Sequence, residues 1–267
     1  MTKTAIAIAA HPDDIEFLMA GTLARLKAAG YETHYWNLAN GCCGTTQYDV
    51  PTIARMRREE GMAAAAAMGA IFHDSICDDL SIFYDKPTLA RVAAVIREVS
   101  PSIVLTHAPV DYMEDHTNTC RLATTAAFTR GMPNFVTDPV RTPVEGKVTV
   151  YHAQPYSHRD PLGNLVEPKL MVDVTSLKEH KRQWLSLHVS QKAWLDESQG
   201  LDSYLDTLTG LDAEVGRMSC VFEYAEGWRR HMHMGFCDPA DDPLREALGS
   251  HVLVAGVPSP QPPPGEV

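Results

Sequence analysis

The chain has 267 residues, of which 45% are hydrophobic, and a formal net charge of −11 from 34 acidic and 23 basic residues. This size suits one large α/β domain, or one domain with a small appendage. The acidic balance argues against a broad phosphate-binding surface, so we expect no nucleic-acid partner. Six cysteines without paired CxxC spacing argue against a zinc ribbon or a disulfide framework. With no signal-peptide pattern and no apolar run near about 18 residues, we expect no membrane partner and a cytoplasmic location.

The first half of the chain alternates short apolar runs with amphipathic patterns. Residues 4–10 (TAIAIAA) are typical of a buried strand, and residues 14–29, closed by Gly30, of a helix. Such an alternation predicts a Rossmann-like parallel sheet flanked by helices on both faces. The further elements predicted in this half are strands at 32–39, 70–77 and 102–107 and helices at 52–68, 89–99 and 117–129.

The pattern changes beyond Pro133. We predict strands at 148–152 and 170–174, the latter at a sheet edge, and a helix at 177–189, whereas residues 203–225 mix helix and strand signals. We therefore expect an α/β fold with a smaller C-terminal β-containing extension. The predicted boundaries are a single domain over 1–255, with its core at about 1–135 and its extension at about 136–255, and a Pro-rich disordered tail over 256–267.

Polar side chains follow two of the predicted strands. His11-Pro12-Asp13-Asp14 comes directly after the first strand, and a second polar cluster, residues 107–116, follows the strand at 102–107. Ligands bind at the carboxyl ends of strands in open α/β sheets. If the two strands are neighbours, His11, Asp14 and His116 form a metal site of two histidines and one carboxylate. A fourth position then stays open for water, as catalytic zinc requires.

Simpler interpretations exist for several of these residues. A Pro-Asp pair can cap a helix, but one Asp suffices for a cap, so two with a nearby His favour a site. Arg57 could lie on a solvated helix face beside Arg55 and Arg58. We expect His107 to support the site or pack in the core, and His188 to be structural. The adjacent Cys42 and Cys43 suit a tight turn better than a reactive role.

These motifs resemble those of the LmbE-like (PIG-L) family of zinc-dependent N-acetylglucosaminyl deacetylases. The turn AHPDDIE at residues 10–16 is similar to the family's first motif, and Asp115-His116 with Asn118 to its second. The resemblance covers most of residues 3–236. Further similar segments are the helix from Arg57 to Gly69, Ser190-Gln191 after His188, and Tyr224-Ala225-Glu226.

The resemblance implies a hydrolase that removes the N-acetyl group from an N-acetylglucosamine-type amino sugar or glycoconjugate. It implies Zn²⁺, or another divalent metal such as Fe²⁺, held by His11, Asp14 and His116. Asp13 would be the general base toward a metal-activated water.

The resemblance further implies that Asp115 belongs to the catalytic machinery and that Arg57 contacts the substrate. Tyr112, beside the second motif, is an additional candidate for substrate binding. Family members often form trimers or hexamers, so a homo-oligomer stays open for this chain.

One departure concerns the second motif, which usually reads His-Pro-Asp-His. This chain has Met113-Glu114-Asp115-His116, and Met113 can neither stabilise an oxyanion nor protonate a leaving amine. Glu114 with a raised pKa could take that role, or the activity could be weak, altered or lost. We favour replacement by another residue. The candidates are Tyr112, His152, His158 and His233.

Two other functions stay open: a non-catalytic metal- or sugar-binding homologue, and a hydrolase of a different small amide. A nucleotide-binding enzyme is disfavoured, because the first turn after a strand lacks GxGxxG.

Overall fold

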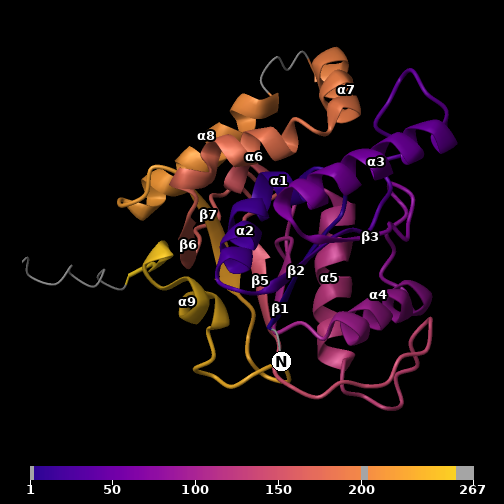
Figure 1. The fold of residues 1–267 in the computed structure, drawn as a ribbon, viewed down its shortest axis with the longest axis vertical. Coiled ribbons are helices and arrows are strands. Elements are labelled where there is room, and N and C mark those ends of the chain that lie inside the picture. Colours follow the sequence, from indigo (N-terminus) through magenta and orange to yellow (C-terminus); the bar gives the residue numbers. More distant parts are fainter. Residues whose placement is uncertain (1–2, 200–203, 257–267) are drawn as a thin grey trace, which may run out of the picture.

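The computed structural model describes residues 3–199 and 204–256, so the tail predicted to be disordered lies almost entirely outside the described residues. Within them, eight strands form one sheet in the order β3-β2-β1-β4-β5-β7-β6-β8 (Figure 1). The strands are β1 (Thr4–Ala9), β2 (Glu32–Asn37), β3 (Ile71–His73), β4 (Ile103–Thr106), β5 (Thr149–Ala153), β6 (Leu170–Asp173), β7 (Ala225–Arg230) and β8 (Val252–Val254).

The sheet is parallel from β3 to β5 and antiparallel beyond it. Strands β3, β2, β1, β4 and β5 run in one direction, and β7, β6 and β8 each pair antiparallel with a neighbour. This confirms the predicted α/β class with a β-containing C-terminal part. The prediction of an edge strand at 170–174 is wrong, because β8, for which no strand was predicted, pairs with the outer side of β6.

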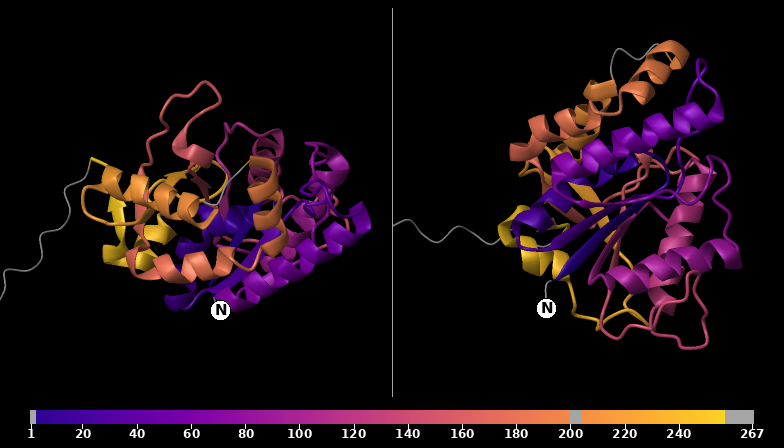
Figure 2. Two further views of the ribbon diagram at one scale, coloured as in Figure 1. Left: turned by 90° about the horizontal axis from the view of Figure 1, so that it is seen from above. Right: turned by 45° about the vertical axis from the view of Figure 1, so that its right-hand side comes forward.

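Helices cover both faces of the sheet, as predicted (Figures 1 and 2). Along β1, the alternate residues Ile6 and Ile8 pack with α4 and α5, whereas Ala5, Ala7 and Ala9 pack with α1–α3, α6 and α8. In the described part of the chain, none of the helices combines the length and apolar character needed to span a membrane. The helices are α1 (Asp14–Leu18), α2 (Ala20–Ala28), α3 (Val50–Met68), α4 (Lys86–Val99), α5 (Glu114–Thr129), α6 (Lys178–Leu185), α7 (Val189–Gln199), α8 (Tyr204–Ser219) and α9 (Pro243–Leu248).

The single helix predicted over 14–29 is wrong, because the chain breaks at Met19 into α1 and α2. The break frees the first N–H groups of α2, and the carboxylate of Glu226 on β7 accepts from Gly21 N at 2.8 Å and Thr22 N at 2.7 Å. A Cβ at Gly21 would lie 2.4 Å from Val174 Cγ1, so only glycine lets the helix approach so closely. A distant carboxylate therefore sets the start of α2.

The same carboxylate belongs to a buried ion cluster. Lys181 on α6 is fully buried, and its Nζ lies 2.7 Å from Glu226 Oε1 and 2.8 Å from Asp212 Oδ2 on α8. Removing one member of such a cluster leaves charge buried without compensation. Lys181 thus links α6, α8, β7 and, through Glu226, α2.

We predict that Lys181→Met lowers the free energy of unfolding by about 3–5 kcal/mol, because Asp212 and Glu226 then lose their cation. Urea denaturation followed by circular dichroism measures the change. The control is Lys147→Met, which removes an exposed ion pair with Asp238 and Asp241 and should change stability little. Equal effects of the two substitutions would contradict the prediction.

Candidate metal centre

The candidate site lies at the carboxyl end of the parallel sheet. Strands β1 and β4 are hydrogen-bonded neighbours, which meets the condition set by the sequence analysis. His11 to Asp14 follow β1, and α5 after β4 begins at Glu114, three residues before its predicted start. His116 therefore lies in the first turn of α5 and faces the turn that follows β1.

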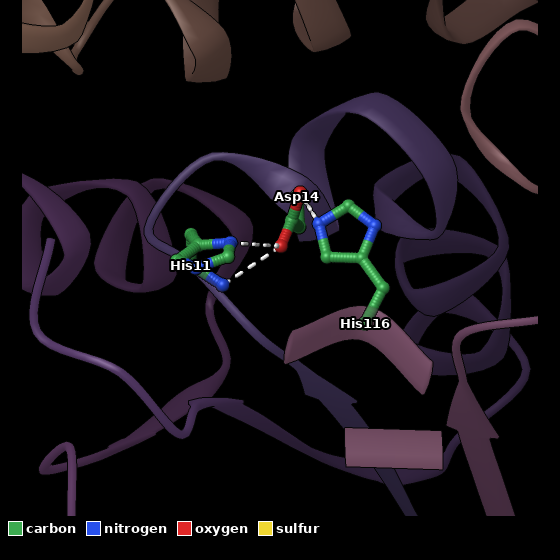
Figure 3. A group of neighbouring side chains, drawn as sticks. All are labelled: His11, Asp14 and His116. Carbon is green, nitrogen blue, oxygen red and sulfur yellow. Dashed lines mark hydrogen bonds and ion pairs between the residues drawn. The ribbon is translucent and has the colours of Figure 1, made fainter. Parts of the chain in front are cut away.

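The three predicted metal ligands converge. Asp14 lies between the two imidazoles, with its Oδ2 3.5 Å from His11 Nδ1 and its Oδ1 3.4 Å from His116 Nε2 (Figure 3). One donor atom from each residue lies within 4.8 Å of the others. Two imidazole nitrogens and one carboxylate oxygen are a donor set that suits Zn²⁺.

A second carboxylate holds each of the two histidines from behind. His11 Nε2 lies 3.0 Å from Asp115 Oδ2, and His116 Nδ1 lies 3.0 Å from Asp111 Oδ1. Asp115 Oδ2 also accepts from the backbone N–H of Leu80 at 2.7 Å. These contacts leave His11 Nδ1 and His116 Nε2 to face Asp14, which is the usual arrangement of metal-binding histidines.

The structure thus places Asp115 behind His11 and not among the residues that line the pocket. Asp111 had no role in the sequence analysis beyond belonging to the polar cluster. Asp111 precedes His116 by five residues. The sequence alone does not show that they touch, because the contact depends on how the chain bends before α5.

The electrostatics of the cluster also fit a divalent cation. Burial lowers the pKa of both imidazoles, but the surrounding carboxylates more than reverse this. They raise the pKa of His11 to about 9 and that of His116 to about 10. The carboxylates therefore stabilise positive charge at this point. A metal can supply that charge while displacing the imidazole protons.

His107 supports the cluster from within the core. Its buried Nε2 accepts from Ala10 N at 2.9 Å and lies 3.4 Å from Asp14 Oδ2. Its ring stacks on that of His116, with centroids 4.1 Å apart and planes 10° apart. Burial lowers the pKa of His107, so the ring is neutral and braces His116, in line with the supporting role expected.

Asp13 is held differently from its neighbours. Its φ of 110° is a left-handed conformation that is unusual for a non-glycine residue, and its side chain makes no helix-capping bond. Instead, the Oη of Tyr204 on α8 donates to Asp13 Oδ2 at 2.7 Å. The helix-cap interpretation is therefore wrong for Asp13.

Burial raises the pKa of Asp13 to about 6, and the charge of Asp14 adds to this rise. The hydrogen bond from Tyr204 opposes it. A carboxylate with a pKa close to the working pH is suited to accept a proton in catalysis. Sequence reasoning missed Tyr204, which lies in the segment where helix and strand signals were mixed.

The cluster opens into a pocket of about 290 Å³. Its wall contains the candidate ligands, Asp13 and residues of loops and helices distant in sequence. Among the other residues that line it are Phe17, Cys43, Arg57, Leu80, Tyr112, Met113, Tyr156, Gln191 and Trp194.

Arg57 is 2% exposed, so the interpretation as part of a solvated helix face is wrong for it, although Arg55 and Arg58 are exposed. Its guanidinium donates to the carbonyl of Pro12 at 3.2 Å and to Gln191 Oε1 on α7. A Cβ at Gly41 would lie 2.7 Å from Arg57 Nε. The side chain is therefore clamped at the pocket wall.

Of the residues considered as substitutes for the missing histidine, the pocket wall contains only Tyr112 among those the structure describes. Tyr112 is 56% exposed, and its ring meets that of His116 edge-on at 5.7 Å between centroids. Tyr156, which sequence reasoning missed, lies beside it at 6.0 Å between ring centroids. Both tyrosines line the pocket together with Met113.

The other candidates for replacing the missing histidine contact residues outside the pocket or do not line it. His152 Nδ1 donates to the carbonyl of His107, and its Nε2 lies 2.9 Å from His231 Nδ1. His158 Nε2 donates to the carbonyl of Leu211. Glu114 is exposed and accepts from Asn118, and His233 is not among the residues that line the pocket.

His188 is fully buried, and its Nε2 lies 3.2 Å from Glu16 Oε1, as a structural residue would be placed.

Cys42 and Cys43 lie near Asp79, whose carboxylate accepts from Gly41 N and Cys43 N. That carboxylate therefore stabilises a tight turn at the pocket rim.

Comparisons with known proteins agree with this site. A family model described as PIG-L: GlcNAc-PI de-N-acetylase matches residues 6–127. The diacetylchitobiose deacetylase of Thermococcus kodakarensis is 28% identical over 195 residues, which cover 71% of this chain and 70% of that protein. The 4-oxalmesaconate hydratase of Pseudomonas putida is 29% identical over 187 residues, which cover 67% of this chain and 70% of that protein.

A solved structure of the N,N'-diacetylchitobiose deacetylase from Pyrococcus horikoshii, in complex with its inhibitor MPG, has the same fold. Its TM-score is 0.72 at 22% identity, and the match covers 87% of this chain and 85% of that chain. Fold and site together define an α/β protein with a candidate divalent-metal centre at the carboxyl end of its sheet. The chain is similar to the PIG-L/LmbE-like deacetylase family, whose model matches its first strands and both polar clusters. Relatives of this chain include a hydratase as well as deacetylases.

We predict that Asp111→Asn weakens Zn²⁺ binding by about 10- to 100-fold, because His116 loses the charge that orients it. Competition with a chromophoric chelator measures the affinity, and circular dichroism checks the fold. Glu145→Gln, which neutralises an exposed loop carboxylate, is the control. An unchanged affinity in Asp111→Asn would refute this role.

Proposed function

We propose that the protein is a zinc-dependent hydrolase that removes the N-acetyl group from an N-acetylglucosamine-type amino sugar or glycoconjugate. The observation that carries the proposal is Asp13, a buried carboxylate of raised pKa held beside a cluster of His11, Asp14 and His116. The diacetylchitobiose deacetylase, which aligns over most of this chain, supports the substrate class.

His11, Asp14 and His116 would hold the metal, and Asp111 and Asp115 would fix the two rings. When bound, Zn²⁺ supplies a Lewis acid that polarises the amide carbonyl and makes water more acidic. Asp13 takes the proton from the attacking water. Tyr204 occupies its Oδ2, so Oδ1 is the atom that receives this proton.

Tyr112 is the residue that we propose in place of the missing histidine. Partial desolvation of the ring and the nearby charges of Asp14 and Asp111 raise the pKa of Tyr112, so its phenol keeps its proton at neutral pH. It can therefore donate a hydrogen bond from Oη to the developing oxyanion, and the proton taken up by Asp13 would then pass to the leaving amine. Arg57 would bind substrate hydroxyl or anionic groups, because its contacts with Pro12 and Gln191 fix its planar fork at the pocket wall.

Hydration of a carbon–carbon double bond is the second candidate function. The observation that favours it is the 29% identity to the 4-oxalmesaconate hydratase, together with Met113 at the pocket wall. Addition of water forms a C–O bond at one carbon and a C–H bond at the other, so a base such as Asp13 would take the proton from water and return it to carbon, with no leaving amine to protonate. A fixed arginine such as Arg57 would bind a substrate carboxylate.

Acetate release from N-acetylglucosamine and N,N'-diacetylchitobiose tests the proposal. We predict that the zinc-loaded protein releases acetate and that Asp13→Asn lowers the rate by about 10²- to 10⁴-fold, as expected for loss of a general base. Asparagine tolerates the left-handed backbone of this position, so zinc content and fold should be unchanged.

Glu145→Gln serves again as the control and should keep full activity. Bound zinc without acetate release from either sugar would overturn the proposal. Loss of absorbance from an unsaturated dicarboxylate would then favour hydration. Turnover of neither substrate class would favour a non-catalytic homologue or a different amide.

We further predict that activity falls as the pH drops through about 6, because Asp13 must be ionised to accept a proton. In Tyr204→Phe the carboxylate loses a hydrogen bond that favours its charged form. The acidic limb of the kcat/KM profile should therefore move to higher pH by about one unit. A limb that does not move would show that Asp13 does not control it.

A further inference from the structure

A second pocket of about 370 Å³ lies between α3 and the carboxyl ends of β2 and β3. We call it the rear pocket. The residues that matter for its chemistry are Asn37, Arg55, Arg57, Arg58, Phe72 and Asp74. Arg57 and its acceptor Pro12 separate it from the pocket of the metal centre, which Arg57 also lines.

The rear pocket is positively charged, although the chain as a whole carries a net charge of −11. Three arginines and one aspartate line it. Arg58 Nε is paired with Asp74 Oδ1 at 2.5 Å. Arg55, in contrast, is exposed and makes no ion pair or hydrogen bond with any residue that the structure describes, although it lies close enough to Asp49 for its charge to lower the pKa of that carboxyl.

Two buried polar atoms of pocket residues have no hydrogen-bond partner within the described residues. These are Arg57 Nε, a donor, and Asn37 Oδ1, an acceptor. Tyr35 Oη donates to Glu16 Oε2, so it must accept from Asn37 Nδ2, and this contact fixes Oδ1 as the free atom. Buried polar groups without partners are rare, because they lose their hydrogen bonds to water and gain none in return.

We propose that the rear pocket binds a small oxyanion that also carries a hydrogen-bond donor, such as hydrogen phosphate or a hydroxycarboxylate. Its oxygens would accept from Arg57 and pair with Arg55, and its hydroxyl would donate to Asn37 Oδ1. The ring of Phe72 supplies an apolar wall for a carbon skeleton. The volume is within the range of small-molecule sites.

The rear pocket is joined to the pocket of the metal centre through Arg57. Arg57 borders both pockets, so a bound anion competes for the guanidinium that also faces the first pocket. A ligand in the rear pocket and a ligand in the first pocket therefore change each other's affinity, by linkage.

Isothermal titration of the zinc-loaded protein with inorganic phosphate, and separately with malate, tests the proposal. We expect saturable binding of at least one anion at one site per chain. Arg55→Gln and Asn37→Leu should each weaken it by about tenfold or more. Arg55 is exposed on a helix, so its replacement keeps the fold even if Asn37→Leu does not.

Two control variants locate the anion. Arg121→Gln removes an equal charge from an exposed site on α5 and should leave binding unchanged. His116→Ala removes a candidate metal ligand but no residue of the rear pocket, so anion binding should persist even if linkage alters its affinity. Binding that His116→Ala abolishes and Arg55→Gln spares would place the anion at the metal and overturn the proposal. Absence of binding, or equal losses in Arg55→Gln and Arg121→Gln, would overturn it too.

Discussion

The position of Asp14 among three imidazoles is the constraint on which the site depends. Its carboxylate lies within 3.5 Å of ring nitrogens of His11, His107 and His116, and it also accepts from His11 N. Buried polar groups are costly when they lack partners. Asp115 and Asp111 supply partners for His11 and His116, so these two rings are held before a metal or a substrate enters, whereas His107 Nδ1 and Asp111 Oδ2 have no partner among the described residues.

The C-terminal half of the chain completes what the parallel sheet begins. Tyr204 holds Asp13, Gln191 holds Arg57, and Glu226 sets the start of α2 directly behind the site. The buried Lys181 joins this layer to the rest of the fold. A site at the end of a parallel sheet thus depends on helices that pack over it, because the segments that follow β1 and β4 supply its candidate ligands but not the groups that hold Asp13 and Arg57.

The sequence predicted the parts of the molecule that follow from local pattern. The alternation of strands and helices gave the sheet, and the adjacency of the first and fourth strands brings His11, Asp14 and His116 together. Long-range contacts could not be read in this way. Tyr204 is 191 residues from Asp13, and the break at Met19 depends on Glu226. Neither contact leaves a periodic signal near the residue that it changes.

The distribution of the site along the chain has a consequence for its biosynthesis. All three candidate metal ligands have been synthesised by residue 116, and the parallel sheet is complete with β5. The hydroxyl that holds Asp13 arrives only at residue 204, and the carboxylate that starts α2 at residue 226. During translation, therefore, the candidate ligands leave the ribosome well before the group that holds Asp13. The two halves of the candidate site become available to fold at different times.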